Sequence, residues 1–485
     1  MGSGASSSKK KVAPVEPEEE PVKQPRLRRC VLLVDGSRAD VEPFLALAMK
    51  LRKAKIDISF ITGEAQRFYV SQFGFRCEGV LGDMQQILAD KEAVLKAYSD
   101  GPVAFAKYVW GPSYANAWAA LDKLQPDFII YNITTLFIAG AWAEANMTPA
   151  IPIFQQLIVA TGEYYPFRLE TQGDCMSGWR EFFRAWIARG HLELVKEAMT
   201  SKHSSVSTPH RLRMMDWESE EAFLQFFADP NQPMIFAVSQ LMTGRPSEYT
   251  DHHHLVGFIP TPTPFTGANP ESKLGLDVRQ AGLFLEGGSA PVSFGWGRMS
   301  SQLDMRDVTV KVITALKDMN LRGIILTGSV SIDITAFENK ELVEYAKENV
   351  LLASSLPHDW LFPQCSCIVH HGGCGTTAEN FRAGRPGVIT PIMLDQLDWA
   401  RWVQQSGVGV VVGHPGRISA AVLAAAVQHC LKDEELCHRA ADLRDRLKDE
   451  NGAEKAASVI RDFIDGPMKS GEWLEKQKQK LSELT

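Results

Sequence analysis

The chain has 485 residues, of which 45% are hydrophobic and 22% are charged, as is ordinary for a globular protein. Its formal net charge of −7 argues against a nucleic-acid-binding protein, which would present a basic face. Eight cysteines in so long a chain form no disulfide framework, and we find no secretory signal, so we expect a reducing compartment. Cys365, Cys367 and Cys374 lie close together, but two of them alternate on a predicted strand and no second ligand cluster follows, so we expect no metal site.

Residues 1–28 are predicted to form a tail that has no core to bury. The opening MGSGASSSKKK places Gly2 after Met1, with Ser6 and then Lys9 to Lys11 behind it, which is the pattern of N-myristoylation. One acyl chain anchors weakly, and a basic cluster is the usual second attraction. We therefore expect a cytoplasmic protein attached peripherally to the cytosolic face of a membrane. The alternatives are a disordered Ser/Gly-rich tail or a remnant of cloning design.

Regular structure is predicted to begin with a β-α-β unit. Val31–Val34 is a short apolar strand, Phe44–Leu51 carries a helical stripe, and Ile56–Ile61 is a second strand. Such a unit implies a parallel sheet. Further strands are expected at 128–131 and 151–154, with a helix at 139–146 between them, whereas residues 166–230 interrupt this rhythm like a helical insert.

A Pro/Thr/Gly-rich stretch, Phe258–Glu271, is the best internal linker, and strand–helix alternation restarts after it. Strands are expected at 291–296, 323–326, 367–369, 387–390 and 408–412, and residues 420–447 are strongly helical. We predict a tail at 1–28, an N-terminal domain at 29–260, a linker at 261–280, a C-terminal domain at 281–460 and a helical tail at 461–485. In two doubly wound α/β domains, ligands bind outside the carboxyl ends of the strands.

The stretch VHHGGCGTTAENFRAG, residues 369–384, has the features of a phosphate site. Its glycines permit close backbone approach, and the two threonines open a helix that stops at Gly384. A glycine turn that leads into a helix N-terminus presents N–H groups and a positive dipole to an anion, and His371 adds a donor. The Walker pattern GxxxxGK is absent, which argues against an ATP-hydrolysing loop.

Asp395 and Gln396 follow the strand that ends at Thr390. A carboxylate beside an amide offers acceptors and donors to vicinal hydroxyls. The alternative is that Asp395 caps the following helix.

The segment LPHDWLFPQCSCIVHHGGCGTTAENFRAGRPGVITPIMLDQLDWARWVQQSGVGV resembles the donor-binding segment of UDP-sugar-dependent glycosyltransferases of family 1. It is most similar to the sterol 3-beta-glucosyltransferase branch and its bacterial antibiotic-glycosylating relatives. DGSRADVEP resembles that branch's GSRGDVQP motif, and PVSFGWGRM resembles PVYVGFGSM. The resemblance covers residues 30–160 and 232–460. It implies the GT-B fold, in which two Rossmann-like parallel-sheet domains face each other across a cleft.

The resemblance also implies roles for individual residues. Asp40 matches the proposed catalytic base, and the alternative is a helix N-cap. The diphosphate would contact His371, Gly373, Gly375, Thr376 and Thr377. The sugar hydroxyls would contact Asp395 and Gln396, and the uracil would contact Ser355, Leu356 and Pro357.

Two departures from the family motifs are Ala39, in place of glycine, and Arg298, in place of serine. Arg298 lies near the expected diphosphate, where it would either strengthen phosphate binding or block the donor.

The helical stretch GWREFFRAWIARG aligns Trp179, Phe183 and Trp186 on one face. This face is either a core helix or an aromatic wall for an apolar acceptor. The sequence therefore predicts an inverting transfer of glucose from UDP-glucose to a sterol-like or other lipid hydroxyl, without a metal ion or other cofactor. The alternative is an inactive nucleotide-sugar-binding scaffold at a membrane.

Overall fold

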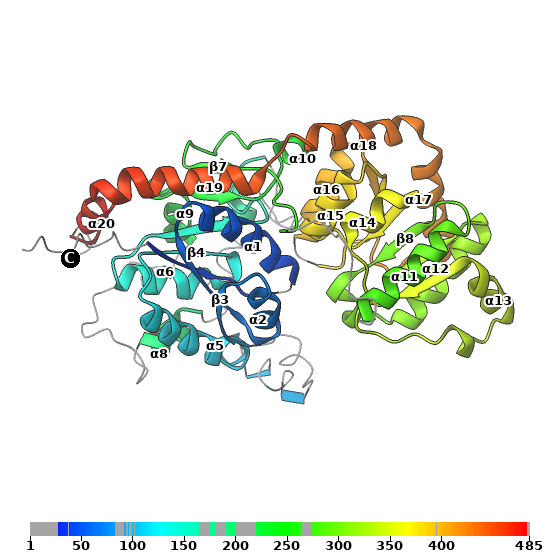
Figure 1. Cartoon of the computed structure of the whole chain (residues 1–485), viewed down its shortest axis with the longest axis horizontal. Coiled ribbons are helices and arrows are strands. Elements are labelled where there is room, and N and C mark those ends of the chain that lie inside the picture. The colour runs from blue at the N-terminus through cyan, green and yellow to red at the C-terminus, as the bar shows by residue number, and fades with distance from the viewer. Residues whose placement is uncertain are drawn as a thin grey trace, which may run out of the picture.

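The computed structural model of the chain describes residues 28–36, 38–82, 92–93, 96, 99–100, 102–163, 175–180, 191–199, 220–262, 273–393 and 395–482. These residues form two α/β domains that lie side by side, the N-terminal one in blue, cyan and green and the C-terminal one in green to orange (Figure 1). None of the described helices combines the length and apolarity needed to cross a bilayer.

Within the described residues, the N-terminal domain contains a seven-stranded parallel sheet in the order β3-β2-β1-β4-β5-β6-β7. Its strands are β1 Arg29–Leu33, β2 Asp57–Gly63, β3 Arg76–Leu81, β4 Phe128–Tyr131, β5 Ala150–Phe154, β6 Met234–Phe236 and β7 His253–Leu255. The helices of this part of the chain are α1 Arg38–Lys53, α2 Glu64–Ser71, α5 Pro102–Leu124, α6 Leu136–Ala145, α8 His191–Met199, α9 Glu220–Ala228 and α10 Gln240–Thr243. Strand order reverses between β1 and β4, which places a ligand-binding crevice at the carboxyl ends of these strands.

The described part of the C-terminal domain contains a six-stranded parallel sheet in the order β10-β9-β8-β11-β12-β13. Its strands are β8 Val292–Gly295, β9 Gly323–Leu326, β10 Val350–Ala353, β11 Cys367–His370, β12 Gly387–Ile389 and β13 Gly409–Val411. Its helices are α11 Lys273–Glu286, α12 Met305–Met319, α13 Lys340–Asn349, α14 His358–Leu361, α15 Cys374–Arg382, α16 Gln396–Gln405, α17 Ala420–Lys432 and α18 Glu434–Leu447. The predicted strands are confirmed, and the predicted helix over 420–447 is two helices, because Asp433 caps α18 with a hydrogen bond from the Leu436 N–H (2.9 Å).

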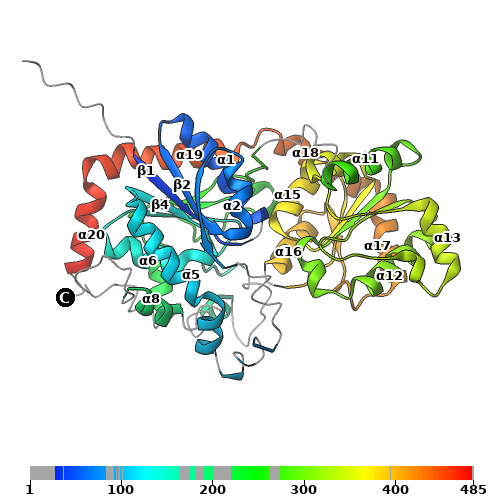
Figure 2. The same ribbon diagram turned by 60° about the horizontal axis from the view of Figure 1, so that its bottom comes forward.

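The chain ends on the N-terminal domain, and this differs from the predicted domain limits. Helix α19, Gly452–Phe463, crosses back and lies along the N-terminal domain in red, followed by α20, Glu472–Ser482 (Figures 1 and 2). The buried face of α19, which includes Ala456 and Ile460, shares one core cluster with Phe44 of α1. The C-terminal domain therefore stops near residue 448 instead of 460.

The predicted linker was also too long. Helix α11 begins at Lys273, and Asp277 in its second turn accepts hydrogen bonds from the N–H (3.1 Å) and hydroxyl (2.6 Å) of Ser354. These contacts make α11 part of the C-terminal domain. The apolar face of α11, which includes Val278 and Ala281, packs in the core of the C-terminal domain.

Candidate functional site

A tight turn joins β11 to α15. The His370 side chain is buried at the end of β11, and its Nδ1 accepts a hydrogen bond from the Gly372 N–H (3.0 Å). Gly372 has φ +89°, and a Cβ there would lie 2.9 Å from Ile389 Cγ2 and 3.1 Å from the Gln396 carbonyl oxygen. Both the dihedral angle and the close packing require glycine. The turn is thereby pressed against β12 and the start of α16.

The N-terminus of α15 is left open by its sequence. The helix begins at Cys374, two residues before the predicted start, and its N-cap is Gly373, which provides no side-chain cap. The first N–H groups of a helix have no partner within it, so those of residues 374–376 are directed at whatever lies beyond the turn. The predicted stop is confirmed: α15 ends at Arg382, and Gly384 follows with φ +67°. This geometry attracts an anion.

The imidazole of His371 lies over the same turn. A Cβ on Gly373 would lie 2.6 Å from His371 Nε2, and one on Gly297 would lie 3.5 Å from its Cε1. Burial lowers the pKa of His371 to about 4, because the ring loses the water that would solvate its charged form. At neutral pH the ring is therefore uncharged. A neutral ring carries a single N–H, and the positive potential at the turn comes from the helix.

The two threonines of the turn differ in position. Thr377 is fully buried, and its hydroxyl donates to the Gly373 carbonyl oxygen (2.9 Å). The prediction that this hydroxyl contacts a diphosphate is therefore not supported, since the side chain faces the core and closes the first helical turn. Thr376 is half-buried at the helix start, and its contact with a diphosphate stays a prediction.

Asp395 occupies the N-cap position of α16, as the alternative interpretation expects, but its side chain makes no capping hydrogen bond. Burial raises the pKa of its carboxyl to about 7, and the nearby carboxylates of Asp40 and Asp398 raise it further. Asp395 thus lies close enough to Asp40 of the other domain for their charges to interact.

Gln396 is buried, and its Oε1 accepts hydrogen bonds from the N–H groups of Ile392 (2.9 Å) and Met393 (3.2 Å). The acceptor oxygen therefore holds the loop after β12. Within the described residues Nε2 makes no hydrogen bond, so Gln396 can offer a donor to a ligand.

Asp40 lies in the first turn of α1, opposite the turn that joins β11 to α15. Helix α1 begins at Arg38, two residues earlier, so Asp40 is not its N-cap. Its carboxyl group covers Gly36, which has φ +128°, since a Cβ there would lie 2.5 Å from Asp40 Oδ2. The Ala39 methyl lies 3.9 Å from where a Cβ on Gly375 would be. The start of α1 and the start of α15 therefore meet directly across the domain boundary.

The other predicted donor contacts have mixed outcomes. Arg298 is half-buried beside Gly297, on the short helical turn after β8. Ser355 is exposed and Pro357 is half-buried at the N-cap of α14, so both stay candidates for contact with the uracil. The Leu356 side chain is buried in the core with Leu361, and so only its backbone remains available for such a contact.

The predicted acceptor wall is corrected where the structure describes it. Trp179 is buried in the core of the N-terminal domain, so the interpretation as a core residue holds for it. Phe183, Trp186 and the lipidation candidate Gly2 lie outside the described residues.

Two further groups that shape the site were missed from the sequence. Gly36 and Gly297 both have positive φ, and the glycines of DGSR and FGWG were the available signal. The Trp296 indole donates to the Thr390 hydroxyl (2.8 Å), which ties the ends of β8 and β12 together beneath the turn. No local pattern predicts that pair, because its members are far apart in the sequence.

A family model, described as the C-terminal domain of erythromycin biosynthesis protein CIII-like proteins, matches residues 326–462, which include α15 and α16. The chain is 26% identical over 455 residues to a sterol 3-beta-glucosyltransferase of Arabidopsis thaliana, covering 90% of this chain and 68% of that protein. It is 24% identical to a sterol 3-beta-glucosyltransferase of Saccharomyces cerevisiae, of which it spans 34%. A solved structure of the kitacinnamycin glycosyltransferase has the same fold, with a TM-score of 0.61 and 17% identity over 90% of this chain and 99% of that one. These relatives are named as transferases, which gives no support to the inactive-scaffold alternative.

Proposed function

We propose that this chain, which belongs to family 1 of the glycosyltransferases, transfers glucose from UDP-glucose to the hydroxyl of a sterol-like or other lipid acceptor with inversion at the anomeric carbon. The observation that carries the proposal is that the first turn of α1, which contains Asp40, meets the open N-terminus of α15, where Ala39 lies against Gly375. A proton acceptor and an anion-binding helix end thus face each other from opposite domains.

The donor diphosphate would bind at the N-terminus of α15. The N–H groups of residues 374–376 and the helix dipole stabilise negative charge there. His371 adds one neutral donor, and Arg298 on the turn after β8 adds a cation. These interactions strengthen as the diphosphate leaves, because its charge grows in the transition state. The scheme needs no metal ion.

The glucose hydroxyls would lie between Asp40 and the turn that joins β11 to α15. The carboxyl of Asp395 accepts or donates according to its protonation, and Nε2 of Gln396 donates. Both side chains lie at the start of α16, and the Gly372 turn, which leads into α15, packs against this start. Sugar and diphosphate are therefore held by one rigid unit of the C-terminal domain.

Asp40 would act as the general base. The acceptor oxygen bonds to the anomeric carbon as its proton passes to the Asp40 carboxylate, and the bond from that carbon to the diphosphate oxygen breaks. UDP leaves on the side of α15. Attack and departure on opposite faces invert the configuration.

The acceptor class rests on the relatives named as sterol 3-beta-glucosyltransferases. We propose that the protein meets such an apolar acceptor at the cytosolic face of a membrane, where acylation at Gly2 and the lysines that follow would hold it.

The test is UDP release from UDP-glucose with a panel of sterols, measured with and without a chelator. Release that depends on a sterol and persists with the chelator is expected. Asp40→Asn keeps the shape of the side chain but removes the base, so kcat should fall roughly 10²–10⁴-fold while the Kd for UDP stays unchanged. Strict dependence on added Mg²⁺, or a loss of UDP affinity in Asp40→Asn, would contradict the mechanism.

A further inference from the structure

Two passages connect the domains in the part of the chain that the structure describes, and they touch where they join the N-terminal domain. The first leaves the N-terminal domain after Phe258, and the second runs through residues 448–451 between α18 and α19. A Cβ on Gly452 would lie 2.5 Å from the Phe258 carbonyl oxygen and 2.6 Å from that of Gly257. Since no side chain fits there, the two passages are in direct backbone contact at the ends that join the N-terminal domain.

The Glu450 carboxylate joins these passages to the N-terminal domain. Its Oε1 accepts a hydrogen bond from the Ser239 hydroxyl (2.6 Å), and its Oε2 accepts one from the Phe258 N–H (3.3 Å). Ser239 is also the N-cap of α10. Glu450 is therefore fixed on both sides, and the second passage cannot shift without moving the first.

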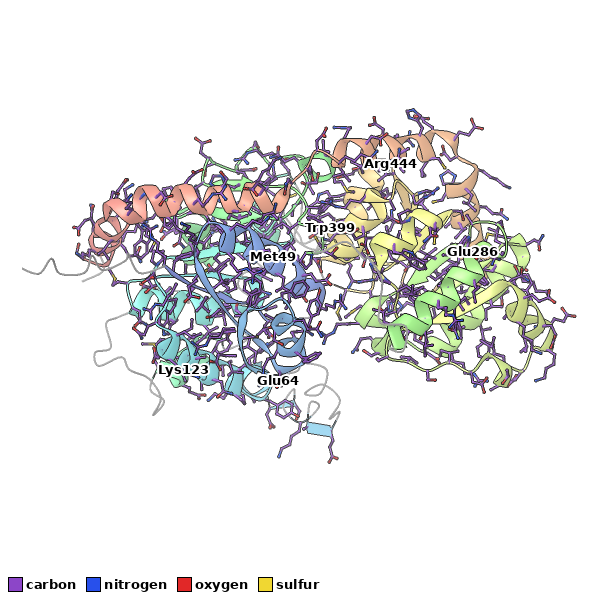
Figure 3. The ribbon with its side chains drawn as sticks, viewed as in Figure 1. Met49, Glu64, Lys123, Glu286, Trp399 and Arg444 are labelled. Carbon is purple, nitrogen blue, oxygen red and sulfur yellow. The ribbon has the colours of Figure 1, made fainter. Side chains whose placement is uncertain are left out.

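Arg382 connects the same point to the donor-binding helix. It is the last residue of α15, and its Nη2 donates to the Phe258 carbonyl oxygen (3.0 Å). The Phe258 ring packs on Trp399 of α16, with ring centroids 5.6 Å apart, where the two domains meet (Figure 3). Helix α15 thus has its N-terminus at the proposed diphosphate site and its C-terminus on the hinge, with about 13 Å of rigid helix between them.

The geometry points to a clamp, formed by Glu450 and Arg382, that makes the two passages move as a single hinge and fixes the angle at which α15 faces Asp40. Both are positioning residues, since neither is placed at the reacting atoms. The clamp itself follows from these contacts alone, whereas its effect on turnover rests on the proposed function.

Small-angle scattering of the purified full chain tests the clamp without any assumption about activity. Arg382→Met keeps the length of the side chain but removes the donor, and Glu450→Ala removes both acceptors. Each should increase the radius of gyration, because the hinge opens. Arg385→Met is the matched control: the Arg385 guanidinium also donates to a backbone carbonyl, that of Pro363, but within the C-terminal domain. An unchanged radius in both clamp variants, or an equal increase in the control, would overturn the clamp.

Kinetics test its consequence. Misplacing the reacting groups by about 1 Å can lower kcat around 100-fold, whereas the Kd for UDP should change less than threefold, because UDP contacts only the C-terminal domain in this scheme. Arg382→Lys keeps a donor and should recover part of kcat, and the control should keep all of it. Weakened UDP binding in Arg382→Met, with kcat unchanged, would refute the positioning role. If the wild type transfers no sugar, the proposed function fails while the scattering result still decides the clamp.

Discussion

Gly373→Ala tests how the turn between β11 and α15 positions the His371 ring. The native φ of −64° and ψ of 144° suit alanine as well as glycine, so the backbone is not strained by the change. The new Cβ would lie 2.6 Å from His371 Nε2, and ordinary contacts are near 3.5 Å. The ring must therefore move by about 1 Å, which takes its donor out of hydrogen-bonding range of a diphosphate.

A hydrogen bond to a charged group contributes about 1.5–3 kcal/mol, so the Kd for UDP should rise roughly 10- to 150-fold. Calorimetry with UDP measures this rise. His371→Ala should lose about the same affinity, and the double variant should lose no more than either single one, since the alanine acts only through the ring. The free energy of unfolding should fall by at most about 1 kcal/mol, the usual cost of a poorer N-cap. Additive losses of affinity in the double variant would refute this reasoning.

Gln396→Ala removes the acceptor for two backbone N–H groups, so the free energy of unfolding should fall by about 1–3 kcal/mol and UDP-glucose should bind less tightly. Gln396→Glu keeps that acceptor oxygen and should lose only affinity for the sugar. Equal destabilisation of the two variants would contradict the role of Oε1 in holding the loop after β12. Because the folded-state pKa of Asp395 is raised from 3.8 to about 7, the native state keeps a proton that the unfolded state loses. This contribution to stability falls as pH rises from about 4 to 7, and Asp395→Asn should flatten that slope in denaturant titrations over the same pH range. Gly2→Ala should move the protein from the membrane fraction to the soluble one, and an unchanged distribution would rule out acylation as the anchor.

The sequence by itself predicted the features that depend on neighbouring residues. The strand at 367–369, the glycine turn and the helix stop at Gly384 follow from local apolar runs and from dihedral angles that glycine adopts most easily. The restart of strand–helix alternation after Phe258 likewise separated the two sheets, because each β-α-β unit is encoded in about 30 consecutive residues.

Tertiary structure decided what each side chain of the site does. Thr377, Leu356 and Trp179 were all predicted to contact ligands, yet packing buries all three side chains. Burial depends on elements far away in the sequence. Helix α19 has the same kind of apolar stripe as its neighbours in the C-terminal domain. Only the complementary face of α1 assigns it to the N-terminal domain. The nearness of Asp40 to Asp395, which raises the pKa of Asp395, also arises only when the two domains meet, because Coulomb interactions depend on distance in space and not on separation along the chain.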